Sequence, residues 1–354
     1  MGEKINNRLH NLDYLRGLAA FGIMFYHYCS WEFGDFTSDT IMERIGIYGV
    51  AIFYVLSGLT LFHVYFEKLN FSKESIFSFF KKRIFRIFPL LWFINIISLF
   101  LIYLSNNPLP SYKVILLNFT GLFGIIAWWA YFSTGVWSIG NELVFYLFFP
   151  FFVLLTKLRR ISMLILSLFI LVCFLYFAFI KLNTNLSLSE QWRNYINPLN
   201  QVFLFLGGFL IGYFFNNKKI QMKASFILLI LGLLIFIFYP SSGNSINIVT
   251  NISRLVFSFS CFIICLSVYK ITKTKDLPKI IHYPLSSLGE MSYSVYLIHP
   301  IIWNFFNLYN LETKIEKIVY MIVVTLIISY LVYSYFEKFF MKLGRNIKIP
   351  YIEK

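Results

Sequence analysis

Residues 12–28 read LDYLRGLAAFGIMFYHY, an apolar stretch that carries Arg16 and His27 eleven residues apart. Three turns of an α-helix take about 10.8 residues and rise about 16 Å, so the two side chains share one helix face. A bilayer core is about 30 Å thick, which puts His27 near its middle if Arg16 sits at one interface. Ionisable side chains are costly there, so the pair is a candidate functional site. The alternative is a histidine packed on a polar neighbour and an arginine that anchors the helix end.

The composition predicts an all-α, polytopic transmembrane bundle. Of the 354 residues, 58% are hydrophobic and only 13% are charged, whereas soluble domains carry about 25% charged residues. The first apolar stretch has no small-residue cleavage site, so we interpret it as a retained membrane helix. The four cysteines fall in apolar segments without a CxxC spacing. They predict buried thiols and no metal site.

Ten apolar runs are long enough to cross a membrane. They cover residues 12–31, 46–66, 84–104, 137–156, 161–180, 200–216, 223–239, 252–270, 287–308 and 317–337. The stretch 112–136 is apolar but broken by three glycines, and we interpret it as a re-entrant or interfacial segment. The loops between the runs are short. We therefore expect a single membrane domain over residues 1–354.

The placement of basic residues predicts the orientation. With the N-terminus inside, most of the 31 lysines and arginines fall on one side of the predicted helices. Cytoplasmic loops carry this excess, so both ends of the chain are expected in the cytoplasm. This asymmetry accounts for most of the net charge of +15 without a nucleic-acid partner.

A basic cluster, KKRIFRIFPLLW at residues 81–92, opens the third helix. Arg83 and Arg86 are three residues apart and share one face, with Lys82 beside them. Positive side chains at a helix N-terminus, together with its free backbone N–H groups, favour an anion. The functional interpretation is a phosphate-bearing cytosolic substrate. The alternative is an anchor on anionic lipid headgroups.

A third cluster, GVWSIGNELVFYLFFP at residues 135–150, contains Glu142, the acidic residue deepest within a predicted span. A carboxylate at that depth needs a partner. It could orient a catalytic histidine or contact an acceptor hydroxyl; the alternative is a structural ion pair, for instance with Arg254. Trp137, Ser138 and Tyr146 surround it in the sequence, and Tyr146 shares its helix face.

A fourth cluster, GEMSYSVYLIHP at residues 289–300, places Ser292, Tyr296 and His299 in one polar stripe. The alternative to a functional stripe is hydrogen bonding between helices. Glycine-containing segments at 56–58 and 207–212 are predicted to serve close helix packing.

These pieces in this order resemble the bacterial acyltransferase-3 family of integral membrane O-acyltransferases. The matching segments are LDYLRGLAA at 12–20 followed by His27, FYVLSG at 53–58, KRIFRIFP at 82–89, WSIGNELVFY at 137–146 and SYSVYLIHP at 292–300. The resemblance implies a ten-helix domain that moves an acyl group, usually acetyl from cytosolic acetyl-CoA, onto sugars at or beyond the outer face. It also implies a lipid-linked or cell-surface glycan as acceptor, with possible glycan-assembly partners and no permanently bound cofactor.

By the same resemblance, Arg16 and His27 carry the family's Arg–His motif, Arg83 and Arg86 its paired arginines, and Glu142 its carboxylate. The sequence departs mildly from the family pattern at Gly140, Asn141 and Tyr293. Some relatives carry a C-terminal esterase-like domain. This chain ends shortly after its last predicted helix, so we expect it to acylate its acceptor directly or through a separate partner.

The resulting hypothesis has acetyl-CoA entering from the cytoplasm, with its phosphates against four basic side chains: Lys82, Arg83, Arg86 and Arg16. His27 then acts as general base on the acceptor hydroxyl, and Glu142 orients it. The predicted substrate contacts are Trp137, Ser138, Tyr146, Ser292, Tyr296 and His299. A covalent acyl intermediate on His27 or a tyrosine is the mechanistic alternative. The competing functions are a flippase for a lipid-linked glycan and a membrane scaffold in polysaccharide assembly.

Overall fold

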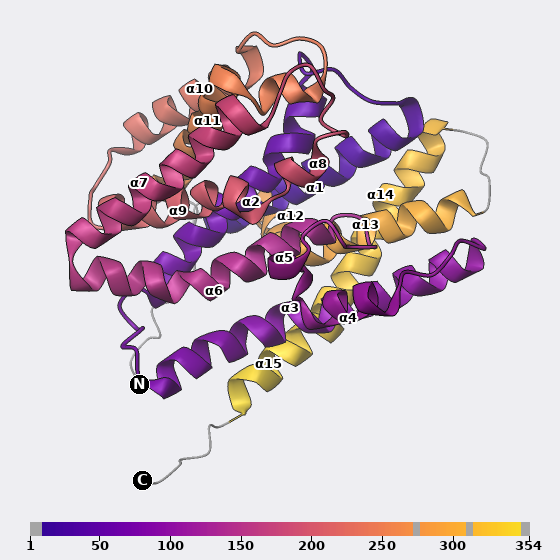
Figure 1. Ribbon diagram of the computed structural model, residues 1–354, viewed down its shortest axis with the longest axis horizontal. Helices are drawn as coiled ribbons and strands as arrows, with labels where there is room; N and C mark the ends of the chain where they lie inside the picture. The colour runs from indigo at the N-terminus through magenta and orange to yellow at the C-terminus, as the bar shows by residue number, and fades with distance from the viewer. Residues whose placement is uncertain (1–8, 272–276, 309–313, 348–354) are drawn as a thin grey trace.

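The computed structural model describes residues 9–271, 277–308 and 314–347, and these parts of the chain form helices and loops without a β-strand. Most of the long helices run across the molecule in similar or opposite directions (Figure 1). The expected all-α bundle is confirmed. Its long helices are α1 (His10–Phe33), α2 (Ile41–Tyr65), α3 (Lys73–Leu104), α6 (Val136–Leu158), α7 (Arg160–Tyr176), α9 (Pro198–Phe215), α10 (Met222–Phe238), α11 (Asn251–Lys270), α13 (Ser292–Asn307) and α14 (Lys314–Leu331).

Short helical elements connect or extend these. They are α4 (Tyr112–Thr120), α5 (Phe123–Ile126), α8 (Trp192–Tyr195), α12 (Lys279–Glu290) and α15 (Lys338–Asn346), with π-helical turns at Phe177–Lys181 and Val332–Glu337 and a 3₁₀ turn at Ser245–Ile248. The stretch 112–136 forms α4 and α5, of nine and four residues. Neither is long enough to cross a bilayer.

Every predicted span overlaps a long helix, but not all of these helices qualify as spans by themselves. By length and composition, seven helices of the described chain could each cross a membrane: Ile41–Tyr65, Lys73–Leu104, Val136–Leu158, Arg160–Lys181, Trp192–Phe215, Asn251–Lys270 and Lys314–Asn346. A shorter apolar helix, α10, adds to them. Ten crossings therefore remain a prediction. It requires α1, α10 and α13 to cross the membrane as well, although none of the three is long and apolar enough by itself.

Two boundaries differ from expectation. The predicted span 287–308 is interrupted at Met291, between α12 and α13. The Ser292 hydroxyl donates to the Gly289 carbonyl across this break (2.9 Å), and Gly289 itself packs against the backbone of α1 at Asp13. The third helix begins at Lys73 rather than 84, because Ser72 accepts a hydrogen bond from the Ser75 backbone and caps it.

Helix α2 lies at the centre of the bundle and packs closely on α9. A side chain at Gly58 would collide with the backbone of Phe205, and one at Gly208 with the backbone of Val55. The predicted packing role of these glycines is confirmed. Close backbone approach of this kind is typical of membrane helices, which associate through small residues.

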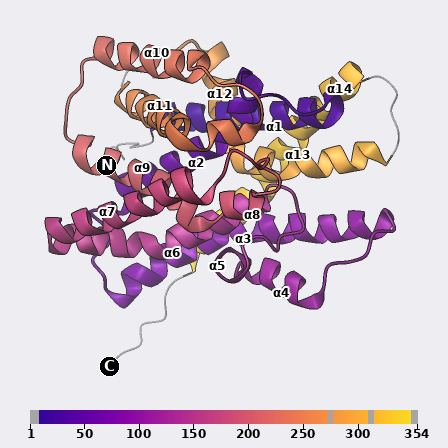
Figure 2. The same ribbon diagram turned by 45° about the horizontal axis from the view of Figure 1, so that its top comes forward.

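The ends of the helices gather on two sides of the molecule (Figure 2). What we call the basic side holds the start of α1 and the end of α2, where the Arg83 guanidinium donates to the Tyr65 hydroxyl (3.2 Å). What we call the far side holds the end of α1, where Glu32 pairs with Lys317 of α14 (2.9 Å). The chain alternates between these two sides.

Candidate active site

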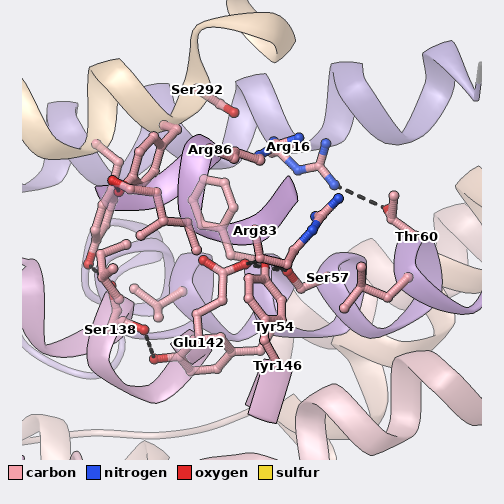
Figure 3. Close-up of a pocket in the computed structure, with 17 residues that line it drawn as sticks. Arg16, Tyr54, Ser57, Thr60, Arg83, Arg86, Ser138, Glu142, Tyr146 and Ser292 are labelled. Carbon is pink, nitrogen blue, oxygen red and sulfur yellow. Dashed lines mark hydrogen bonds between the residues drawn. The ribbon is translucent and has the colours of Figure 1, made fainter. Parts of the chain in front are cut away.

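A central cavity of about 90 Å³ lies between α1, α2, α3, α6 and α13 (Figure 3). It brings together residues that are far apart in the sequence, including most of those predicted to form the site. Its polar lining consists of Arg16, Tyr54, Ser57, Thr60, Arg83, Arg86, Ser138, Glu142, Tyr146, Ser292, Tyr293 and Tyr296.

Three arginines gather at one end of the central cavity (Figure 3). Arg16 pairs with Asp13 one turn earlier (3.1 Å) and donates to the Thr60 hydroxyl (3.2 Å). The Arg83 guanidinium lies over the Tyr65 and Tyr146 rings, and its buried Nε has no hydrogen-bond partner. Within the described chain, Arg86 makes no hydrogen bond or ion pair. The cluster therefore has unused donors for an anion.

Glu142 faces the same cavity, but it does not contact His27. Its Oε1 accepts hydrogen bonds from the Ser57 hydroxyl (2.5 Å) and from the Tyr146 hydroxyl. The expectation that Glu142 orients His27 is therefore not met. The alternative pairing with Arg254 is not met either, since Arg254 donates to the Asn200 carbonyl (2.9 Å) and stacks on phenylalanine rings.

A second cavity of about 330 Å³ opens on the basic side and shares Arg16, Thr60 and Arg86 with the central one. We call it the basic-side cavity. Arg345 of α15 also lines it, and the sequence analysis missed this residue. The sequence feature that could have identified it is the set of three basic residues among apolar ones in KFFMKLGR, after the last predicted span. Lys82, by contrast, is exposed and lines neither cavity; its ammonium lies 5.9 Å from the Tyr65 ring centre.

A third cavity of about 310 Å³ opens on the far side, and we call it the far-side cavity. It holds two predicted site residues that the central cavity lacks, His27 and Trp137. Val50 and Tyr296 line both cavities and therefore form the wall between them. The Tyr296 hydroxyl accepts from Ser138 (2.9 Å) and donates to the Gly135 carbonyl (3.2 Å), which fixes the ring in this wall.

The partner of His27 is His299, which is fully buried. His27 Nδ1 lies 2.9 Å from His299 Nε2, and His299 Nδ1 lies 3.1 Å from the Val295 carbonyl. A carbonyl only accepts, so His299 Nδ1 carries a proton and its Nε2 accepts when the ring is neutral. His27 Nδ1 must then be the donor. This leaves a lone pair on His27 Nε2, for which the described residues provide no partner.

Neighbouring rings hold this pair in place. The His27 ring stacks on Trp31 with 4.9 Å between ring centres. The Tyr28 hydroxyl donates to the His299 carbonyl (3.0 Å), the group that precedes Pro300 in α13. The histidines of the first and fourth sequence clusters therefore form one fixed unit, which the sequence did not predict because each was considered within its own helix.

Comparison with known proteins places almost the whole chain in one sequence family. The family described as an acyltransferase domain matches residues 9–334. The putative acetyltransferase ORF330 of Acidianus two-tailed virus is 26% identical over 292 residues, which cover 80% of both chains. The O-acetyltransferase OatA of Staphylococcus aureus is 26% identical over 350 residues, covering 90% of this chain and 54% of the relative. The chain thus spans about half the length of the staphylococcal relatives.

Proposed function

The chain belongs to the acyltransferase-3 family, and from this premise we propose that it takes an acyl group, acetyl in the simplest case, from cytosolic acyl-coenzyme A and transfers it to a sugar hydroxyl on the opposite side of the membrane. It is an O-acyltransferase with transmembrane helices. One observation carries the proposal. The central cavity, which is lined by three arginines, and the His27 cavity meet at a common wall formed by Val50 and Tyr296.

The basic-side cavity suits the donor. Coenzyme A is a polyanion, and guanidinium groups form strong, often bidentate hydrogen bonds with phosphate oxygens. Arg16, Arg86 and Arg345 line this cavity, and Arg83 lies further in. The excess of basic residues on this side favours a cytoplasmic orientation, which places the donor cavity where acyl-coenzyme A occurs. Both termini are then cytoplasmic, in the inner membrane of a bacterium.

His27 suits the acceptor step. Its Nδ1 is held by His299, its Nε2 has a free lone pair, and the residue lines the far-side cavity. The acceptor hydroxyl oxygen attacks the thioester carbonyl as its proton passes to His27 Nε2; the carbon–sulfur bond breaks, and the coenzyme A thiolate takes the proton back. Tyr296, the polar residue of the wall, and Ser138, which donates to its hydroxyl, lie where the two substrates would meet. Glu142 and its Ser57–Tyr146 network face the donor side of this wall.

A covalent route uses the same residues. In it, His27 Nε2 attacks the thioester, coenzyme A leaves, and the acyl-imidazole passes the group to the acceptor hydroxyl. Direct transfer needs both substrates at the wall together. Mass spectrometry of the protein after incubation with acetyl-CoA alone distinguishes the routes, because only the covalent one leaves an acetyl group on a peptide containing His27.

The deciding experiment measures acetyl transfer by the purified full-length protein in lipid vesicles, with radiolabelled acetyl-CoA and bacterial surface polysaccharide as acceptor. His27→Ala is expected to lower the rate by about 10²- to 10⁴-fold, the usual contribution of a general base. The matched control is His282→Ala, a histidine that contacts Tyr14 and lines none of the three cavities. Equal rates for the two variants would contradict the assignment of His27.

A further inference from the structure

The far-side cavity differs in character from the rest of the site. Aromatic rings form much of its lining, including Tyr26, Tyr131, Trp137 and Trp192. Trp137 and Trp192 meet edge to face with 5.5 Å between ring centres, and the Trp192 indole donates to the Tyr131 hydroxyl (2.7 Å). These contacts fix the rings. Rigid aromatic faces beside a few polar groups are typical of small-ligand sites, and the C–H faces of a sugar ring pack well on them.

The charged residues of this cavity are two carboxylates. Among the described residues that line it, Asp35 and Glu43 are acidic and there is no lysine or arginine. Glu43 is only 2% exposed and accepts hydrogen bonds from Tyr26 (2.9 Å) and Ser245. Asp35 is exposed, and Ser30 donates to it at 3.4 Å.

The nearest basic residues on this side are engaged elsewhere. The Arg44 guanidinium donates to the carbonyls of Ser38, Phe236 and Ile237 and does not line the cavity. Lys317 pairs with Glu32, and the Arg193 guanidinium lies over the Trp129 ring. Neither carboxylate is paired with a lysine or arginine among the described residues, so the cavity is acidic in composition, with Asp35 as its exposed carboxylate.

We propose that the far-side cavity binds the acceptor as a sugar residue without negative charge, either neutral or amine-bearing, and that Asp35 and Glu43 exclude sugars with carboxylate or phosphate groups. This inference rests on the proposed function. The aromatic rings hold the sugar face, and the two carboxylates accept hydrogen bonds from its hydroxyl or ammonium groups. An anionic sugar would place like charges in contact, and that repulsion provides the specificity.

The test uses three tetrasaccharides of equal length with acetyl-CoA and the full-length protein in vesicles: an oligomer of N-acetylglucosamine, one of glucosamine and one of galacturonic acid. We expect kcat/KM for the anionic oligomer to be at least about tenfold below that of the better of the other two. The double variant Asp35→Asn, Glu43→Gln should reduce this ratio severalfold. Asp35→Asn alone, at an exposed position that does not depend on core packing, should reduce it in the same direction.

The matched control is Asp39→Asn, which removes an exposed carboxylate from the same far-side loop but outside the cavity. It should leave the ratio unchanged. Two results would overturn the inference while leaving acetyl transfer intact. One is a kcat/KM for the anionic oligomer equal to or above that of the others. The other is a ratio of these kcat/KM values that the Asp35 and Glu43 variants leave unchanged. Absence of His27-dependent coenzyme A release with all three oligomers would count against the proposed function and the inference with it.

Discussion

The basic-side and far-side cavities of this acyltransferase are of similar size, but they offer different groups to a ligand. The first is lined by three arginines together with Asp13, Glu290 and Glu337. The second is lined by aromatic rings, two carboxylates and His27. The difference indicates how one bundle keeps two substrates apart. In the proposed reaction, the guanidinium groups of the first cavity bind the phosphates of the donor. The second cavity has no lysine or arginine among its described residues and suits an acceptor sugar without negative charge.

The largest effect in testing this comparison is expected at Arg86. Since Arg86 makes no hydrogen bond or ion pair within the described chain, Arg86→Ala removes a charge without breaking either kind of contact. A charged hydrogen bond contributes about 1.5–3 kcal/mol, so kcat/KM for acetyl-CoA should fall about 10- to 100-fold while KM for the acceptor stays the same. Arg86→Lys should recover part of the loss, because a single ammonium replaces the planar fork. If the KM for the acceptor rose instead, Arg86 would act on the acceptor, which contradicts the assignment of the basic-side cavity to the donor.

Substitutions of His299, the partner of His27, test the far-side cavity in the same way. His299→Phe keeps a ring in the buried site but removes the acceptor for His27 Nδ1, so the tautomer of His27 is no longer fixed. We expect kcat to fall about tenfold or more, with KM for acetyl-CoA unchanged. His299→Gln, which can still accept this hydrogen bond, should retain more activity than His299→Phe. Equal loss in both variants would assign His299 a packing role only.

Substitutions of Tyr296 test whether its ring separates the central cavity from the far-side cavity. Tyr296→Phe keeps the ring and removes the hydroxyl that is hydrogen-bonded to Ser138 and to the Gly135 carbonyl. We expect kcat to fall severalfold. Tyr296→Ala opens the wall and should let water reach the thioester. Acetate release from acetyl-CoA without acceptor, measured against wild type, would then increase; an unchanged rate of hydrolysis would show that the ring does not separate the cavities.

The smallest effect is expected at Lys82. Its place beside Arg83 predicts a phosphate contact, but its side chain is exposed and lines neither the central nor the basic-side cavity. Lys82→Ala should change kcat/KM for acetyl-CoA by less than about twofold, in line with most surface substitutions. A loss comparable to that of Arg86→Ala would mean that the donor cavity extends along the exposed face of α3 (Lys73–Leu104).

The sequence was most informative where the bilayer constrains the chain. Each apolar run forms a helix because backbone groups in lipid must be satisfied within the segment, and polar side chains inside such runs are few enough to be noticed. Arg16 and Glu142 stand out in this way, and Arg83 and Arg86 stand out as a basic cluster at the start of the third run. All four line one cavity.

The sequence was least informative about which helices meet. His27 pairs with His299 rather than Glu142 because of how α1 and the α12–α13 segment are rotated against each other. Part of that geometry is set at Gly17, where a Cβ would lie 2.6 Å from the backbone nitrogen of Gly289. A contact of this kind depends on two glycines 272 positions apart and leaves no local pattern in either helix. Ser57, taken as part of a packing segment, was missed for the same reason.

The wall of Val50 and Tyr296 has a consequence for the cell as well as for the reaction. In the proposed orientation, cavities enter from the two faces of the membrane, and Val50 and Tyr296 separate the central cavity from the far-side cavity. A continuous file of water at this point would conduct protons and dissipate the gradient on which the cell depends for energy. In the proposed reaction the acetyl group passes this same wall, so the phenol ring that separates the two substrates also blocks a file of water between the cavities.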